Sequence, residues 1–202
     1  VKGNLIGCFG LTESITGSNP SAMETNFEEV SDGYILNGSK NWITNAPIAD
    51  VFIIWAYDKN KNVHGFILDK QLKGLTTSKI EKASIKIAQA GKIFLKDVKV
   101  SKDSILPNTE GWKSVYSCIN KARYGIAWGA MGAAETCWHI AKEYTEKRII
   151  NGRPLASRQL VQKKLADMLT EVALGFSSCI LVGRQMDKGK DLKIAISMLK
   201  RN

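Results

Sequence analysis

The chain has 202 residues, 44% of them hydrophobic and 24% charged, which is typical of a globular protein with a hydrophobic core. The formal charge of +10 suggests nucleic-acid binding, but its lysines and arginines are spread among acidic residues along the whole chain. We therefore expect no nucleic-acid binding. No apolar run reaches the roughly 18 residues of a membrane span, so we expect no membrane insertion.

The four cysteines, Cys8, Cys118, Cys137 and Cys179, form no Cys-x-x-Cys pair. This spacing argues against a zinc site or a disulfide framework and fits a reducing compartment. We therefore expect four thiols in or near the core, no metal site and a protein that is not secreted. Since the chain starts at Val1 without a methionine, and its last apolar helical pattern has no stop signal, we expect an excerpt of a longer protein.

The first half of the chain has the character of a β domain. Short runs of β-branched and aromatic residues alternate with turn residues before Pro107, and roughly six strands are expected in this part. The pair Asn37-Gly38 predicts a hairpin turn. The clearest predicted strands are Val51–Tyr57, Val63–Leu68 and Lys92–Val100, the first two joined by a polar turn.

The second half has helical periodicity. A first helix is predicted from about Gly111 to Lys147, and its Gly125, Gly129 and Gly132 share one face. Glycine costs roughly 1 kcal/mol relative to alanine inside a helix, so we expect another backbone to pack closely against that face. A second helix is indicated by apolar residues that step by threes and fours, namely Val161, Leu165, Met168, Val172, Phe176, Cys179 and Val182.

The short segment 149–155 between these helices predicts antiparallel neighbours. The expected fold class is therefore α+β. An antiparallel β-barrel or sandwich over residues 1–106 is followed by the first helices of an up-down helical bundle over residues 107–202.

Two segments of the β part could carry chemistry. Gly7–Thr25 holds glycines, hydroxyls and an acid directly after a short apolar strand, and such a loop can offer backbone N–H groups to a polar ligand or can be a simple surface turn. In Asn41–Asn45, Trp42 beside Thr44 can stack on a planar ring and hydrogen-bond its edge, or can be an ordinary core tryptophan.

Taken together, these segments resemble the flavin-binding signature of the acyl-CoA dehydrogenase family. The match consists of Gly-Leu-Thr-Glu-x-x-x-Gly-Ser at Gly10–Ser18, followed by Trp42-Ile-Thr44. The resemblance implies that the two segments enclose the ring system of FAD. The implied cofactor-binding residues are Phe9, Leu11, Thr12, Ser18, Trp42, Ile43 and Thr44, and Ser18 is also implied to contact the acyl-CoA thioester.

The helical half is similar to the glutaryl-CoA dehydrogenases of this family, in Ala122–Glu135 and Gln159–Glu171. The resemblance makes residues 1–106 the middle, flavin- and acyl-CoA-binding domain. It places Tyr116, Asn120 and Arg123 along the acyl-CoA path, although Arg123 considered alone could be a solvated residue on a helix surface.

Arg148 and Gln159 match an Arg-x-x-Phe-Gly-x-Pro-Leu…Gln element of the family that reaches the FAD of a neighbouring subunit. The resemblance therefore implies a homo-oligomer, typically a tetramer. The chain departs from the family pattern where Asn19 replaces an aspartate and Asn151 replaces a phenylalanine. Further departures are Ser14, Thr16, Lys86, Ala88 and Ala90.

The activity that the resemblance implies is FAD-dependent α,β-dehydrogenation of an acyl-CoA thioester. The specific expectation is oxidative decarboxylation of glutaryl-CoA to crotonyl-CoA, in fatty acid and amino acid catabolism, with electrons passing to an electron-transfer flavoprotein. The family's catalytic glutamate is expected beyond residue 202. We therefore expect no catalytic residue within the chain and an inactive 202-residue segment.

Two alternatives remain open. One is an acyl-CoA oxidase-like enzyme of the same fold, and the other is a non-catalytic protein that binds acyl-CoA or flavin or serves in assembly. The expected location is the cytoplasm in a bacterium or the mitochondrial matrix in a eukaryote.

Overall fold

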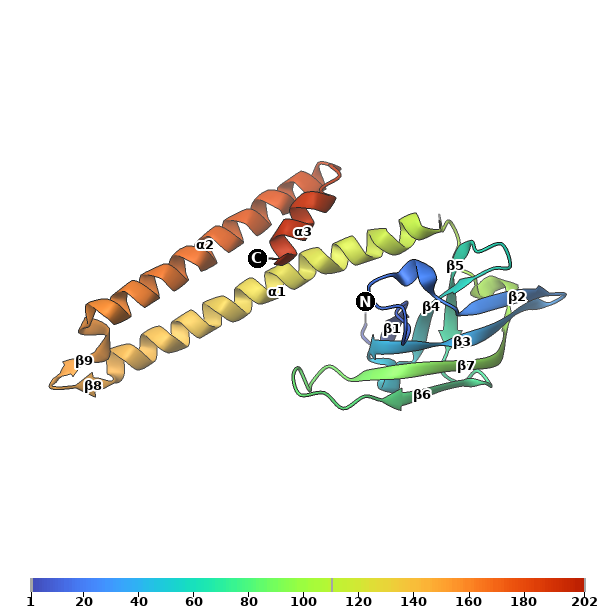
Figure 1. Ribbon diagram of the computed structural model, residues 1–202, viewed down its shortest axis with the longest axis horizontal. Coiled ribbons are helices and arrows are strands. Elements are labelled where there is room, and N and C mark those ends of the chain that lie inside the picture. Colours follow the sequence, from blue (N-terminus) through green and yellow to red (C-terminus); the bar gives the residue numbers. More distant parts are fainter. Residues whose placement is uncertain (1, 110, 202) are drawn as a thin grey trace. The chain divides into compact units, whose positions relative to one another are not determined.

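The computed structural model describes residues 2–109 and 111–201 (Figure 1). The chain divides into two compact units, Val1–Ser114 and Val115–Asn202. The boundary predicted at residues 106 and 107 lies between a short 3-10 helix, η3 (Lys102–Ser104), and the first long helix.

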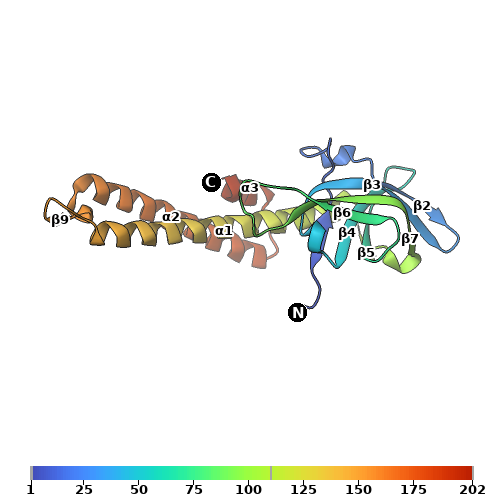
Figure 2. The same ribbon diagram turned by 90° about the horizontal axis from the view of Figure 1, so that it is seen from below.

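The first unit is built on one strongly curled, seven-stranded sheet, in the order β1-β4-β2-β3-β7-β6 with β5 paired to β4 (Figure 2). Its strands are β1 (Gly7–Gly10), β2 (Asn26–Val30), β3 (Gly33–Thr44), β4 (Val51–Tyr57), β5 (Val63–Asp69), β6 (Leu75–Lys79) and β7 (Ala90–Ser101). Besides η3, the unit has the short 3-10 helices η1 (Pro20–Ala22) and η2 (Ala46–Ile48). The α+β class is confirmed. The expectation that all strands pair antiparallel is wrong, because β1 pairs with β4 in parallel and a single parallel pair, Asn26–Tyr57, joins β2 to β4.

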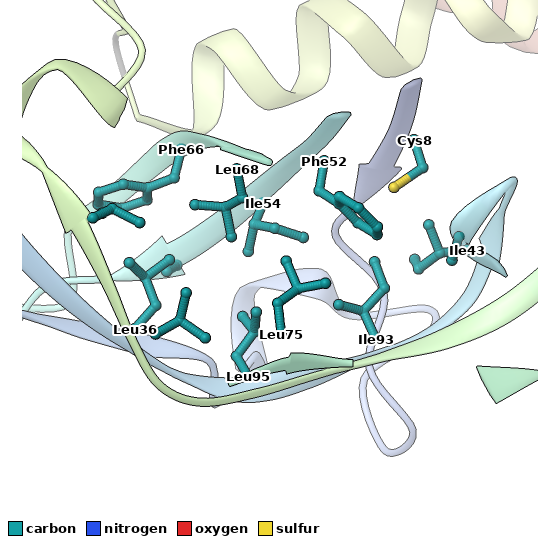
Figure 3. Close-up of a cluster of buried hydrophobic side chains, with 14 of the residues drawn as sticks. Cys8, Leu36, Ile43, Phe52, Ile54, Phe66, Leu68, Leu75, Ile93 and Leu95 are labelled. Carbon is teal, nitrogen blue, oxygen red and sulfur yellow. The ribbon is translucent and has the colours of Figure 1, made fainter. Parts of the chain in front are cut away.

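The core of this unit lies inside the curl of the sheet. It is filled by side chains of β3, β4, β5 and β7, and burial alternates most regularly along β7, as the period of two of a strand predicts. Figure 3 shows this cluster, in which Leu36, Ile54, Phe66, Leu68 and Ile93 are completely buried.

The predicted hairpin at Asn37-Gly38 is wrong. This pair lies in the middle of β3, at a β-bulge where Leu36 pairs with Val98 but Gly38 pairs with Leu95. The Asn37 side chain accepts a hydrogen bond from the Asp97 amide at 2.8 Å and donates one to the Asp97 carboxylate at 3.2 Å. The pair therefore stabilises a bulge across two strands, and β2 turns into β3 just before Gly33.

Two long helices, α1 (Trp112–Lys147) and α2 (Gln159–Asp187), make up most of the second unit, which takes in α1 from Val115 onward. They run antiparallel as predicted (Figure 1). A small hairpin of β8 (Ile149–Ile150) and β9 (Arg153–Pro154) and the 3-10 helix η4 (Leu155–Ser157) join them, and α3 (Lys193–Arg201) follows. The Tyr124 hydroxyl of α1 donates to the Cys179 carbonyl of α2 at 2.9 Å. At the other end, the Trp138 indole donates to the Leu165 carbonyl at 2.9 Å.

The glycine face of α1 is not packed as expected. A β-carbon built at Gly125, Gly129 or Gly132 meets nothing within 4 Å among the described residues. Close packing occurs instead at two glycines of α2. A methyl group at Gly175 would overlap the Met131 sulfur, and one at Gly183 would overlap the Tyr124 hydroxyl.

The cysteines also differ from expectation. Cys8 and Cys179 are buried, whereas Cys118 and Cys137 are exposed on α1. Burial raises the pKa of the Cys8 thiol to about 12, so this group behaves as a small apolar core residue.

Helix α2 is long and apolar enough to cross a membrane by length and composition. The expectation that no segment has these properties therefore needs correction. One such helix is weak evidence, so this finding alone assigns no membrane role.

Candidate functional site

The loop after β1 is closed on itself by a buried carboxylate. Glu13 accepts hydrogen bonds from the Glu24 amide at 2.7 Å, the Thr25 amide at 3.0 Å and the Thr25 hydroxyl at 2.5 Å. These bonds connect the start of the loop to its end, where the chain enters β2. The loop between them holds η1 and the exposed Ser18.

A buried lysine of β3 completes this network. The Lys40 ammonium lies 2.9 Å from the Glu13 carboxylate and donates to the Leu11 carbonyl at 3.1 Å, and its side chain is 0% exposed. Its stem passes so close to Gly10 that a β-carbon there would lie 3.3 Å from Cγ of Lys40. Sequence reasoning noted Glu13 as part of the loop but missed Lys40. A lysine at an inward position of a strand is the signal that could have found it.

The two charges perturb each other. Burial lowers the pKa of Lys40 to about 8, although the Glu13 carboxylate acts to raise it. Burial acts to raise the pKa of Glu13. The Lys40 charge and the hydrogen bonds from Glu24 and Thr25 act in the opposite direction and outweigh it, so that the pKa lies below its ordinary value of 4.5. Both groups are therefore charged at neutral pH.

Glu13 is expected to contribute to acid unfolding. Its pKa is lower in the folded chain than its ordinary 4.5, so its stabilisation is present above pH 4.5 and is lost as the pH falls through the folded value. The difference in unfolding free energy between the wild-type chain and Glu13→Gln should shrink over that window. Urea denaturation from neutral pH down to about pH 3 measures it. Asp50→Asn, which removes a surface ion pair with Lys70, should show a smaller change because solvent screens that pair.

A second β-bulge of β3 controls where Trp42 points. Lys40 pairs with Ile93 and Ile43 pairs with Gly91, so Asn41 and Trp42 together lie opposite the single residue Lys92. Strict alternation from the inward Lys40 would bury Trp42. The extra residue reverses the alternation, so that Ile43 is buried at 3% while Trp42 is 57% exposed.

Trp42 has a left-handed backbone conformation, with φ of 59°. For a bulky residue this conformation costs about 1–3 kcal/mol and commonly occurs at functional sites. Thr44, two residues on, is also exposed. The bulge therefore presents an aromatic ring and a hydroxyl to the outside of the strand.

The loop and the bulge are directly connected. The Asn41 amide donates to the Thr12 carbonyl at 2.8 Å. Thr12 is partly exposed and Phe9 is 37% exposed, with its ring centroid 6.1 Å from that of Trp55. The structure thus links the two sequence segments that were expected to act together.

Two of the predicted cofactor-binding residues have buried side chains. Ile43 belongs to the hydrophobic core cluster, where Figure 3 shows it beside Phe52 and Cys8, and Leu11 is only 6% exposed. Their side chains therefore pack in the interior of the unit, and the Leu11 carbonyl already accepts a hydrogen bond from Lys40.

The predicted acyl-CoA residues lie on α1 in the second unit. Spacings of four and three residues place Tyr116, Asn120 and Arg123 on neighbouring turns of the helix. Arg123 donates to the Asn120 side chain at 3.3 Å, and its guanidinium is exposed. Tyr116 is 40% exposed.

Arg148 and Gln159 lie at the opposite end of α1. Arg148 follows the last turn of α1, and Gln159 is the first residue of α2; both are exposed. At 1.5 Å per residue, Arg148 is about 38 Å from Arg123 along the helix axis. The structure therefore separates these residues from the Tyr116–Arg123 group of the same helix.

The asparagine at position 151 suits the turn in which it lies. Asn151 and Gly152 have positive φ angles of 52° and 73°, and they form the two-residue turn between β8 and β9. Such a turn favours Asn-Gly, whereas an aromatic residue at the first position would be strained. Asn19 likewise has a local role, since it accepts a hydrogen bond from the Ser21 hydroxyl at 2.5 Å.

Comparison with known proteins agrees with this architecture. The family model described as acyl-CoA dehydrogenase, middle domain, matches residues 8–98, and that described as acyl-CoA dehydrogenase, C-terminal domain, matches residues 109–202. The chain belongs to the acyl-CoA dehydrogenase family.

Several relatives are similar over most of the chain. Glutaryl-CoA dehydrogenase of Desulfococcus multivorans is 36% identical over 83% of this chain and 44% of its own length. The short-chain specific acyl-CoA dehydrogenase of Megasphaera elsdenii is 35% identical over 100% of this chain and 54% of its own. The crystal structure of a glutaryl-CoA dehydrogenase from Mycobacterium smegmatis in complex with FADH2 has a TM-score of 0.92 and 37% identity, and covers 96% of this chain and 50% of that one. The chain thus spans about half the length of these relatives.

Proposed function

We propose that the chain is the flavin- and acyl-CoA-binding part of an enzyme that dehydrogenates an acyl-CoA thioester. The observation that carries this proposal is the bulge of β3, which exposes Trp42 in a strained backbone conformation beside Thr44. The similar M. smegmatis enzyme, whose structure holds FADH2, supports FAD as the cofactor.

The residues present fit a flavin. An exposed indole can cover the face of a planar ring, and the exposed or partly exposed hydroxyls of Thr44 and Thr12 can bond its polar edge. Phe9 adds a second exposed ring, and the Ser18 hydroxyl is available for the thioester end of the substrate. When bound, FAD supplies the redox chemistry, and the protein supplies position and electrostatics.

Arg123 and its neighbours on α1 supply the polar contacts for acyl-CoA. The planar guanidinium of Arg123 can pair bidentately with a phosphate or carboxylate. Its hydrogen bond to Asn120 holds it against the helix. The Tyr116 ring is exposed on the preceding turns of the same helix.

No described carboxylate is assigned as the base that removes the α-proton. Glu13 is unsuitable because it is buried, paired with Lys40 and held at a pKa below 4.5. The base of the proposed reaction is a glutamate outside residues 1–202, as the family resemblance implies.

Within this class we propose glutaryl-CoA as the substrate, on the similarity of Ala122–Glu135 and Gln159–Glu171 to glutaryl-CoA dehydrogenases. Identities of 36% and 35% to the glutaryl- and short-chain enzymes leave a short-chain acyl-CoA as the competing substrate. Turnover of glutaryl-CoA against butyryl-CoA by the whole enzyme distinguishes them, since only glutaryl-CoA releases carbon dioxide.

We further propose a homotetramer and electron transfer to an electron-transfer flavoprotein. Exposed Arg148 and Gln159, far along α1 from Arg123, are available to the cofactor of a neighbouring subunit. Of the two departures behind the non-catalytic alternative, Asn151 suits the turn between β8 and β9, whereas the bond that Asn19 accepts from Ser21 would be accepted equally by the usual aspartate.

The test of the flavin site is the visible absorption spectrum of the purified chain before and after addition of FAD. We expect a shifted, protein-bound flavin spectrum. Trp42→Asn should weaken FAD binding about tenfold through the loss of ring stacking, equivalent to about 1.4 kcal/mol. Asparagine tolerates the left-handed conformation, so the thermal midpoint should not fall. Trp42→Phe, which keeps a ring, is the control. A free-flavin spectrum from folded wild-type chain would contradict the assignment.

A further inference from the structure

The buried ion pair Glu13–Lys40 differs from the other ion pairs of the described chain. The Lys40 and Glu13 side chains are 0% and 6% exposed, whereas pairs such as Lys70–Asp50 and Lys163–Asp167 lie at the surface. Removing two charges from water is unfavourable, and well-packed apolar residues often stabilise a protein as much or more. Stability alone therefore does not account for this pair.

The pair connects three separate segments. Lys40 in β3 bonds the Leu11 carbonyl just after β1, and Glu13 bonds the Glu24 and Thr25 amides just before β2. The Met23 sulfur lies 3.6 Å from the ammonium. Both ends of the 11–25 loop are thus fixed to the strand that carries Trp42.

The pair also defines the bulge. Lys40 must point inward to reach Glu13, and Ile43 must point inward to fill the core. Residues three apart in a regular strand point to opposite faces, so both requirements are met only with an extra residue between them. The extra residue is one of the two, Asn41 and Trp42, that lie opposite Lys92, and its presence turns Trp42 to the exposed side of the strand.

We propose that the Glu13–Lys40 ion pair is a positioning element for the flavin site. It fixes the Thr12 backbone and the Trp42 bulge in their binding arrangement without itself touching the cofactor. This proposal rests on the flavin-binding function proposed above.

The experiment compares Lys40→Met, Glu13→Gln and the double variant Glu13→Gln/Lys40→Met with the wild-type chain. The two readouts are the FAD dissociation constant and amide hydrogen exchange. Lys70→Met, which removes the lysine of a surface ion pair, is the matched control and should leave both unchanged.

In Lys40→Met we expect at least about tenfold weaker FAD binding and about tenfold faster exchange in peptides that cover the 11–25 loop and the Asn41 amide. Exchange in β4 and β5 should stay as in the wild type. The double variant removes the unpaired buried carboxylate, so it should recover the thermal midpoint but not the FAD affinity.

A purely structural role gives a different result. In that case FAD affinity falls and recovers together with the thermal midpoint in all variants. Recovery of both FAD affinity and thermal midpoint in the double variant would therefore overturn the proposal. Unchanged loop exchange in a folded Lys40→Met chain also overturns it. If the wild-type chain binds no FAD, the flavin function fails separately, while the exchange measurement still decides whether the pair fixes the loop and the bulge.

Discussion

Phe66→Ala is expected to lower the free energy of unfolding of the β-rich unit by about 3–5 kcal/mol. The Phe66 side chain is 0% exposed, and its ring centroid lies 4.8 Å from that of Phe27 and 5.4 Å from that of Tyr34. Its removal leaves a cavity among rings that cannot collapse without moving the sheet. Urea denaturation followed by circular dichroism measures the loss.

The neighbouring Ile67 provides a matched control. It lies on the same strand but points outward and is 43% exposed. Ile67→Ala should cost less than about 1 kcal/mol. Equal losses at the two positions would contradict the location of the core inside the curl of the sheet.

Gly38→Ala is expected to destabilise the same unit by about 2–4 kcal/mol, from a strained backbone and overpacking together. Gly38 has φ of 144°, and a β-carbon there would lie 2.5 Å from the Thr25 hydroxyl oxygen and 2.7 Å from its α-carbon. Because Thr25 bonds Glu13, the substitution should also disturb the loop after β1. Thermal unfolding and amide exchange of that loop are the measurements.

Gly17→Ala is the control for this prediction. Gly17 lies in the loop itself, where a β-carbon meets nothing within 4 Å and no unusual φ is required. It should change the thermal midpoint little. A comparable loss in both variants would show that the close contact with Thr25 is not the cause.

Much of the fold could be predicted from local patterns. The strands Val51–Tyr57 and Val63–Leu68 and the two long helices follow from periodicity and composition, which report local burial directly. The Asn-Gly pairs show where such reasoning stops. Asn151-Gly152 forms a tight turn, whereas Asn37-Gly38 forms a bulge, because its partners Asp97 and Thr25 come from distant parts of the chain.

The site could be predicted only in part. The motif residues Thr12 and Trp42 come from connected segments, as expected, but the bulge that exposes Trp42 depends on the pairing of β3 with β7. Lys40 was missed for a similar reason, since its partner Glu13 is 27 positions away and its burial is set by tertiary packing. The glycine face of α1 was predicted from helical spacing, but spacing does not determine whether another backbone packs against it, and none of the described residues does.

Trp42 is also a position where evolution or engineering for stability alone would work against binding. Its strained conformation would be relieved by asparagine or glycine, the residues that tolerate positive φ. A screen that scores only resistance to heat would therefore favour the loss of this ring, and the screened protein would become more stable as it lost its proposed ligand contact. At Phe66 and Gly38, by contrast, the native residue serves stability directly. A stability map of the unit should thus separate residues retained for folding from those retained despite their cost to it.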